Sequence, residues 1–154
     1  MSDDPFRDPG GRAASADTDQ PSITELVAAL YPALATGDRK ALSGLVATAF
    51  EGTLTAGLPL GIGGVHRGRE AMIEDGWWAF GRAFRVRPEP SVWMPCPDGR
   101  LLVLGRYVGC ARASGTPIDA DFVHLWSADA GRLTAVWQLT DSALFVQALE
   151  RISP

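Results

Sequence analysis

The segment PIDADFVHLWSADAGRLTAVWQLT, residues 117–140, carries the clearest structural pattern in the sequence. Large apolar side chains alternate with small or polar ones on both sides of Asp129-Ala-Gly131. A short glycine-containing stretch between two alternating runs is typical of a β-hairpin. The pattern therefore predicts two paired antiparallel strands, residues 117–127 and 132–140.

The rest of the chain completes an α+β pattern around this hairpin. Two more strands, residues 86–94 and 100–112, precede it and are bounded by the turn signals Asp98-Gly99 and Ser114-Gly115. The other expected elements are a helix from Ser22 to Thr36-Gly37 with a kink at Pro32, a short helix after Asp38 that includes Leu42, Leu45 and Val46, a strand at 50–55, a glycine-rich loop at 57–64, a helix at 69–84, and a closing helix at 142–150 after Asp141. This order predicts a curved antiparallel sheet wrapped around helices that pack on its concave side.

Composition and charge narrow the classes of function. The chain of 154 residues fits one domain, and its net charge of −4 offers no basic surface for a nucleic acid. Two cysteines, Cys96 and Cys110, are too few for a disulfide framework, so we expect the protein to reside in a reducing, cytoplasmic compartment. We expect both cysteine side chains to be small buried apolar groups. The longest uncharged stretch, residues 52–66, is too short to cross a membrane. Residues 1–20 have the composition of a disordered acidic tail, which leaves 21–154 as the folded domain.

Four passages of the chain resemble a known family. They are residues 35–42 with 49–51 (ATGDRKAL and AFE), 64–70 (GVHRGRE), 120–126 (ADFVHLW) and 131–141 (GRLTAVWQLTD). In this order they resemble the cone-shaped fold of the nuclear transport factor 2 (NTF2)-like superfamily, and specifically its SnoaL-like branch, over residues 23–149. The resemblance implies a homodimer paired through the outer face of the sheet, where Trp93 and Trp137 are expected. Because this fold hosts cyclases, isomerases, dehydratases, epoxide hydrolases and non-catalytic proteins, it does not fix a reaction.

One face of the sheet groups side chains that suit proton chemistry. Pairing through the turn at 129–131 places His124 opposite Gln138, and pairing through Ser114-Gly115 brings Tyr107 near His124. One residue of slip in the second pairing would place Arg106 or Val108 there instead of Tyr107. His124, whose unperturbed pKa is near neutrality, is the natural proton carrier, and Tyr107 and Gln138 suit the stabilisation of negative charge. These three are the expected catalytic residues. The alternative is a buried neutral His124 whose hydrogen bonds are satisfied by Gln138 or Tyr107.

The resemblance bears on both His124 and Gln138. In SnoaL-like cyclases a histidine at the corresponding place faces the cavity, and the residue 14 positions later is an aspartate that serves as general base. This chain has Gln138 there. An amide does not accept a proton at neutral pH, so aldol chemistry of that kind is not expected. Asp121 is a candidate replacement base, although alternation places it on the opposite face unless a bulge turns it inward.

Aromatic side chains are expected to form the substrate pocket, with Asp121 as a further substrate-binding candidate. Trp77 and Trp126 suit a flat apolar wall that stacks on a ring, with Phe80 and Phe122 beside them. The alternative for each aromatic residue is an ordinary place in the core.

The sequence carries no Cys/His cluster, P-loop or dinucleotide-binding fingerprint, so neither a metal nor a cofactor is expected. His66 is expected to be exposed. Glu74 and Asp75 are expected on a solvated helix face or at the mouth of the cone.

Together these patterns predict a cytoplasmic, cofactor-independent cyclase or isomerase that acts on a hydrophobic, oxygenated, polyketide-like molecule. The Ala-, Arg- and Gly-rich composition is similar to that of chains from high-GC bacteria, where the SnoaL-like branch serves secondary metabolism and antibiotic biosynthesis. A pericyclic ring closure assisted by shape and hydrogen bonds also fits. The alternatives are a non-catalytic protein that binds the same class of molecule for resistance or delivery, and a dimerising scaffold whose cone is filled.

Overall fold

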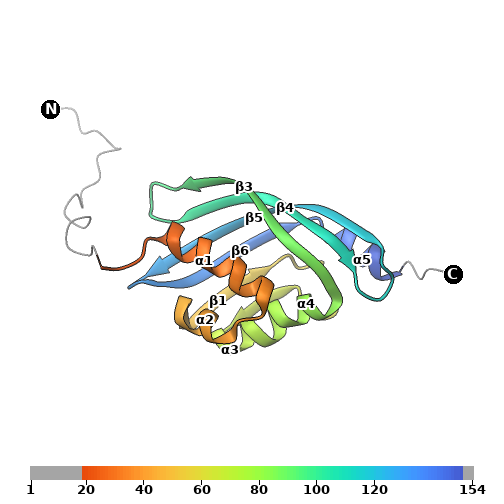
Figure 1. Cartoon of the computed structure of the whole chain (residues 1–154), viewed down its shortest axis with the longest axis horizontal. Coiled ribbons are helices and arrows are strands. Elements are labelled where there is room, and N and C mark those ends of the chain that lie inside the picture. Colours follow the sequence, from red (N-terminus) through yellow and green to blue (C-terminus); the bar gives the residue numbers. More distant parts are fainter. Residues whose placement is uncertain (1–18, 151–154) are drawn as a thin grey trace.

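The computed structural model describes residues 19–150, and Figure 1 shows their arrangement. The α+β class is as expected, with one curved sheet of six strands, but residues 64–67 form a strand that the sequence did not predict between the glycine-rich loop and the next helix. The expected tail at residues 1–20 lies almost wholly outside the described residues. Within residues 19–150, the structure has no helix of the length and apolarity needed to span a membrane.

The first helix, α1 (Ile23–Thr36), begins and ends where the sequence predicts. The hydroxyl of Ser22 accepts a hydrogen bond from the backbone N–H of Glu25 at 3.1 Å, which caps the helix. The helix ends at Gly37, whose left-handed conformation favours glycine. The expected kink does not divide the helix, which continues through Pro32. Pro32 lies on the exposed side, where solvent can satisfy the carbonyl that the missing N–H leaves without a donor.

The remaining helices are α2 (Arg39–Leu45), α3 (Arg69–Ala71), the π-helical segment η2 (Met72–Trp78), α4 (Ala79–Ala83) and α5 (Ser142–Glu150). The segments α3, η2 and α4 follow one another without a break and form the helix expected after Gly68. The π-helical segment η2 includes Trp77 and Trp78, which are partly buried and pack against the core.

The strands are β1 (Val46–Leu54), β2 (Gly64–Arg67), β3 (Phe84–Pro95), β4 (Leu101–Ala111), β5 (Pro117–Asp129) and β6 (Arg132–Thr140). Their order across the sheet is β2-β1-β6-β5-β4-β3. The pair β1 and β6 is parallel, and the other neighbouring strands are antiparallel. His124 lies opposite Gln138, as the turn between β5 and β6 predicts.

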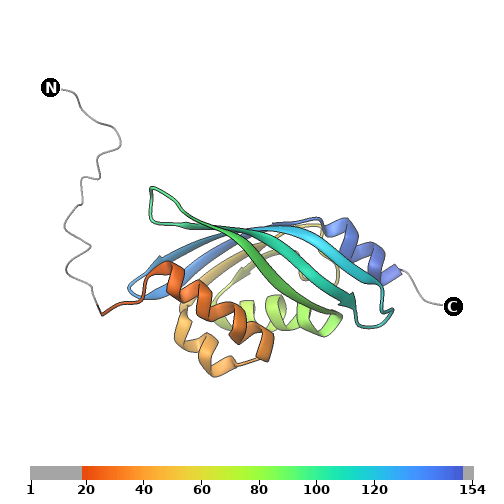
Figure 2. The same cartoon turned by 45° about the horizontal axis from the view of Figure 1, so that its top comes forward.

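The helices cover the concave face of the sheet. Figures 1 and 2 show α1 and the η2–α4 stretch on the same side of the strands, with α5 at the far end of the sheet. The inward side chains of these elements form one hydrophobic core, whose largest fully buried side chains are Phe50, Phe84, Phe122, Trp126 and Phe145. The arrangement is the expected cone, closed at one end by α5.

The register between β4 and β5 differs from the expected one. Tyr107 lies opposite Ala120, and it is Val103 that lies opposite His124. Residues 112–116 form a wider loop than the expected two-residue turn, and the backbone N–H of Ala111 donates to the carbonyl of Thr116 at 2.9 Å. The observed register of β4 against β5 differs from the expected one by an even number of residues. Tyr107 therefore stays on the concave face of the sheet.

Trp93 was expected on the outer face of the sheet but lies on the inner face, where its ring centroid is 5.8 Å from that of Tyr31. A β-bulge between Pro90 and Val92 shifts the alternation of β3 by one residue and turns Trp93 inward. Trp137 points outward and is 46% exposed. The expected homodimer stays a prediction.

Three smaller expectations were wrong. His66 is 8% exposed rather than solvated, because β2 pairs with β1 and its imidazole Nε2 lies 2.7 Å from the carbonyl oxygen of Ile62 in the preceding loop. Val46 begins β1 instead of ending α2. Cys96 and Cys110 are half-buried rather than buried: Cys96 lies in the turn after β3, and Cys110 lies next to the last residue of β4.

Candidate active site

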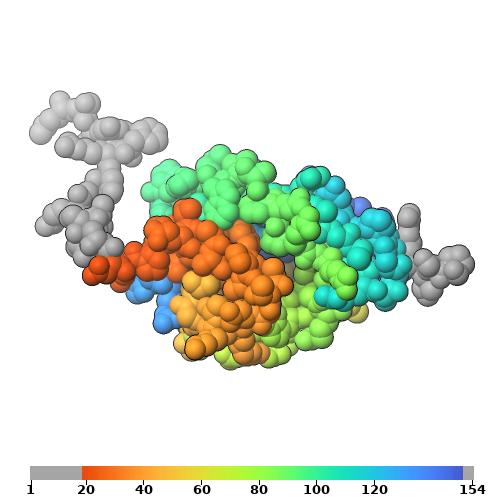
Figure 3. Space-filling model, viewed as in Figure 1, coloured from red at the N-terminus to blue at the C-terminus, as the bar shows by residue number. Residues whose placement is uncertain are grey.

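An apolar cavity lies between the sheet and the helices. Figure 3 shows the surface hollowed between the orange atoms of α1 and the green atoms of α4. The space into which the centre of a water molecule fits measures about 110 Å³, which is several times what one buried water needs. None of the residues that line it is an aspartate, glutamate, lysine or arginine. The cavity therefore suits an uncharged organic molecule.

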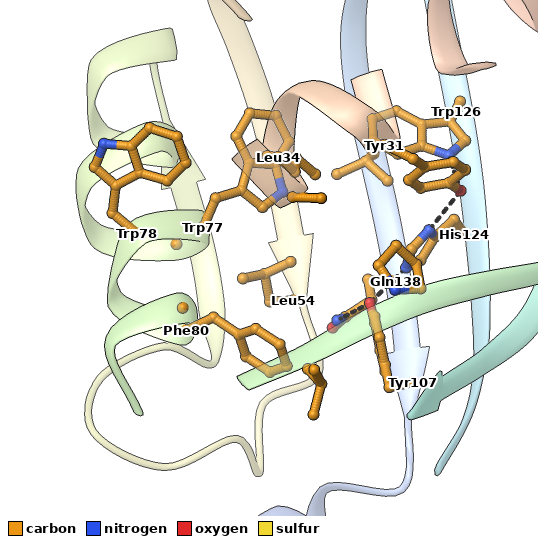
Figure 4. Close-up of a pocket in the computed structure, with 16 residues that line it drawn as sticks. Tyr31, Leu34, Leu54, Trp77, Trp78, Phe80, Tyr107, His124, Trp126 and Gln138 are labelled. Carbon is orange, nitrogen blue, oxygen red and sulfur yellow. Dashed lines mark hydrogen bonds between the residues drawn. The ribbon is translucent and has the colours of Figure 1, made fainter. Parts of the chain in front are cut away.

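Aromatic side chains from two directions face each other across the cavity. Trp77 and Trp78 from η2 and Phe80 from α4 form one side, and Trp126 from β5 lies on the other, as Figure 4 shows. Trp77 packs on Phe50 with ring centroids 5.7 Å apart, which holds the indole in place. The walls thus offer flat apolar surfaces on which a ring can stack.

On the side of the cavity opposite Trp77, a chain of hydrogen-bonded polar side chains is centred on His124 (Figure 4). The Nδ1 atom of His124 lies 2.9 Å from the hydroxyl oxygen of Tyr31, and its Nε2 atom lies 2.6 Å from that of Tyr107. The amide Nε2 of Gln138 donates to the hydroxyl of Tyr107 at 2.9 Å, and the indole N–H of Trp126 donates to the hydroxyl of Tyr31 at 3.4 Å. We call these five residues the Tyr–His–Tyr chain.

The Tyr–His–Tyr chain is held in place at one end and at its centre. The amide oxygen of Gln138 accepts a hydrogen bond from the backbone N–H of Thr55 at 3.2 Å, which ties the chain to the end of β1. The ring of His124 stacks on Phe122, with centroids 4.0 Å apart and planes at 19°. Stacking and hydrogen bonds together fix the orientation of the imidazole, as preorganised chemistry requires.

Burial decides the charge of these groups. His124 is 6% exposed, and loss of hydration lowers its pKa from 6.5 to about 3. Loss of hydration likewise raises the pKa of both Tyr31 and Tyr107 above the ordinary value of a phenol. At neutral pH the imidazole and both phenols are therefore uncharged. His124 is a hydrogen-bonding partner rather than a resident imidazolium acid.

The lowered pKa of His124 predicts a pH dependence of stability. Between about pH 5 and 6.5 the unfolded chain binds a proton at His124 that the folded protein does not bind, so the free energy of unfolding falls as the pH falls. The expected slope approaches about 1 kcal/mol per pH unit at the acid end of this window. Urea unfolding at several pH values measures it. His124→Asn removes the titrating group, and an unchanged slope in this variant would contradict the burial argument.

The structure brings most of the expected site residues together. His124, Gln138, Tyr107, Trp77, Trp126 and Phe80 all line the cavity. Phe122 lies behind the ring of His124. Asp121 lies exposed on the outer face, opposite Arg106, because β5 pairs with β4 without a bulge at this point. Glu74 and Asp75 are exposed, and Glu74 pairs with Arg39.

Tyr31 is the functional candidate that the sequence analysis missed. It follows Val27 by four residues and precedes Leu34 by three, so helical spacing places it on the inner face of α1. That spacing is a usable signal. Its contact with His124 joins residues 93 positions apart and depends on how α1 crosses the sheet.

Within residues 19–150, no group of three or more His, Cys, Asp or Glu side chains is arranged to hold a metal ion.

Comparison with known proteins identifies the fold of this geometry. No family model matches the chain, and no curated protein matches its sequence at a significant level. Solved structures do match. An NTF2-like protein from Burkholderia thailandensis E264 is 26% identical, has a TM-score of 0.74, and aligns over 85% of this chain and 99% of its own. The chain has the NTF2-like fold. This confirms the resemblance and the cone expected from the sequence.

Other solved structures with the NTF2-like fold carry more specific descriptions. A protein from Jannaschia sp. CCS1 described as a SnoaL-like polyketide cyclase is 19% identical, with a TM-score of 0.71 over 85% of this chain and 92% of its own. TerC, co-crystallised with polyporic acid, is 24% identical, with a TM-score of 0.71 over 83% of this chain and 98% of its own. At these identities the likeness shows the NTF2-like fold.

Proposed function

We propose that this NTF2-like protein is a cyclase or isomerase that acts without an added cofactor on an apolar, oxygenated, polyketide-like molecule. The observation that carries the proposal is the Tyr–His–Tyr chain, a buried polar wall inside a cavity otherwise lined by apolar side chains. Hydrogen-bond donors in such a dry site stabilise charge that develops on a carbonyl oxygen. The aromatic walls would hold a flexible substrate in the conformation that reacts.

The residues favour some reactions over others. No carboxylate lines the cavity, and Gln138 stands where the aldol cyclases of the SnoaL-like branch carry an aspartate. A proton shift within the substrate or a pericyclic ring closure needs no external nucleophile and no ionised base. A SnoaL-like polyketide cyclase and TerC, the latter crystallised with polyporic acid, are among the proteins of this fold, which supports an oxygenated, ring-forming substrate class.

Non-catalytic binding is the second candidate, and one observation favours it. His124 and the two tyrosines are uncharged at neutral pH, and the cavity lining includes no ionised group. A carrier or resistance protein needs only such a neutral pocket that matches its ligand.

Mass-resolved chromatography separates the two candidates. An extract of the cells that make the protein is incubated with wild type and with His124→Gln, which keeps one donor and one acceptor. We expect a new peak of unchanged mass with wild type that falls by about a hundredfold in rate with the variant. An extract metabolite retained by the protein without a new peak would instead establish binding. Equal peaks with both proteins would show that His124 is structural.

A further inference from the structure

The Tyr–His–Tyr chain contains more hydrogens than it needs to form its own hydrogen bonds. The indole of Trp126 and the amide of Gln138 can only donate through the atoms that they present, so the hydroxyl oxygens of Tyr31 and Tyr107 each accept one hydrogen bond from the ends. Between these two oxygens lies His124, with one ring nitrogen against each. The direction of the two central bonds remains to be assigned.

A neutral imidazole allows two arrangements of these two central hydrogen bonds. It carries one N–H and one lone pair, so it donates to one tyrosine and accepts from the other. Three hydrogens, from Tyr31, His124 and Tyr107, therefore serve two bonds. One phenolic hydrogen is left over: that of Tyr31 when Nδ1 carries the proton, and that of Tyr107 when Nε2 carries it. No residue among those described takes this hydrogen, and both tyrosines line the cavity, so it is available to a ligand.

We propose that His124 relays protons between Tyr31 and Tyr107 by switching tautomer, and that the cavity interconverts an uncharged apolar ketone with its enol by a proton shift between carbon and oxygen. The proposal rests on the catalytic form of the function proposed above. The ligand spans the two hydroxyl groups, with its carbonyl oxygen at one tyrosine and the adjacent C–H at the other.

The protons and electrons of this step balance. In the Nδ1–H state, the hydroxyl hydrogen of Tyr31 passes to the carbonyl oxygen, and the hydrogen on Nδ1 of His124 passes to the oxygen of Tyr31. Nε2 takes the hydrogen of Tyr107, and the oxygen of Tyr107 takes the proton from the carbon next to the carbonyl. The C–H electron pair becomes the C=C bond of the enol, and the C=O π pair holds the new O–H. The protein ends in the Nε2–H state. Once the hydrogen now on Tyr107 exchanges with solvent, the reverse transfer delivers a solvent-derived hydrogen to the carbon.

The relay suits the electrostatics of the site. Burial disfavours a phenolate at either tyrosine and an imidazolium at His124, so a stepwise route through one of these ions is costly. A concerted shift passes through none of them, because each group gains one proton as it loses another. Gln138 acts through Tyr107 and is a positioning residue: its amide keeps one lone pair of that oxygen occupied and orients the hydroxyl.

Exchange of 2-tetralone in D₂O tests the proposal. This uncharged bicyclic ketone forms its enol at the carbon between the carbonyl group and the aromatic ring. NMR follows the replacement of hydrogen by deuterium at that carbon. We expect wild type to accelerate the exchange. Tyr31→Phe and Tyr107→Phe should each lose at least about a hundredfold of the acceleration, because either change interrupts the relay. His124→Gln should lose as much, since its donor and acceptor atoms have fixed roles.

Two measurements keep these outcomes distinct from misfolding. Tryptophan fluorescence measures the binding of 2-tetralone, and thermal unfolding checks the fold of each variant. Trp137→Phe, on the exposed outer face, is the matched aromatic control and should keep the wild-type exchange rate.

Each alternative result overturns the relay in a different way. If either tyrosine variant keeps the wild-type exchange rate, the relay is wrong while the proposed proton-transfer function stands. If 2-tetralone binds without exchange, the catalytic function falls as well and binding remains. If 2-tetralone does not bind, the cavity does not accept an apolar ketone.

Discussion

Gly109→Ala is expected to lower the free energy of unfolding by about 3 kcal/mol. Strand β3 curls closely over β4 at this point, so an added Cβ would overlap the carbonyl oxygen of Arg85 and lie 2.8 Å from the Cα of Val86. Both are backbone atoms, which no rotamer change can move aside. The strand β3 must therefore shift away from β4, and urea unfolding measures the cost.

Gly44→Ala is the matched control. Gly44 lies within α2, and an added Cβ there would meet no atom within 4 Å. The same chemical change should raise stability by roughly 0.5–1 kcal/mol, because alanine favours helix more than glycine does. A Gly109→Ala protein as stable as wild type would contradict the close approach of the strands. Because Val86 on β3 lines the cavity, Gly109→Ala should also weaken ligand binding.

The fold was largely predictable because its pattern is local. The short turn at Asp129-Ala-Gly131 joins β5 and β6 directly, and His124 and Gln138 meet as expected, although a bulge between Ser127 and Ala128 shifts the register by one residue on the way. Alternation along β5 then assigns Asp121 to the outer face. Helix caps at Ser22 and Asp38 were equally readable, since each cap depends on a side chain within three residues of the bond that it makes.

Features that depend on longer loops or on bulges were less predictable. The register of β4 depends on residues 112–116, whose loop is held by the hydroxyl of Ser114 donating to the carbonyl of Ala148 in α5. That contact is invisible in the local sequence. The same holds for Trp93, which a bulge in β3 turns inward against α1.

Part of the candidate site could be predicted from the sequence. The sheet supplied His124, Tyr107 and Gln138 through alternation, and their common face survived an error in register because the error was even. Tyr31 and the charge state of His124 came only from the three-dimensional arrangement, because desolvation depends on everything packed around the ring. The sequence suggested a proton carrier, and the fold makes it a neutral one.

Gln138→Glu is expected to reverse the pH dependence of stability. Gln138 is buried, and the cavity lining offers no cation to a carboxylate at this position. In the folded protein this Glu therefore keeps a proton that it releases in the unfolded chain, so its pKa is raised on folding and stability is lost as the pH rises. Between pH 7 and 8 the variant should lose about 1 kcal/mol per pH unit, where wild-type His124 contributes no slope.

At about pH 8 the loss relative to wild type should reach roughly 3–5 kcal/mol, the cost of a buried charge without a partner. Gln147→Glu makes the same chemical change on an exposed position of α5 and should stay within about 0.5 kcal/mol of wild type. The midpoints of urea unfolding at pH 6, 7 and 8 for wild type, Gln138→Glu and Gln147→Glu test this prediction. A Gln138→Glu protein as stable at pH 8 as wild type would mean that water hydrates the wall around Tyr107. Such a wall would also let His124 ionise, and the argument for a neutral imidazole would fail with it.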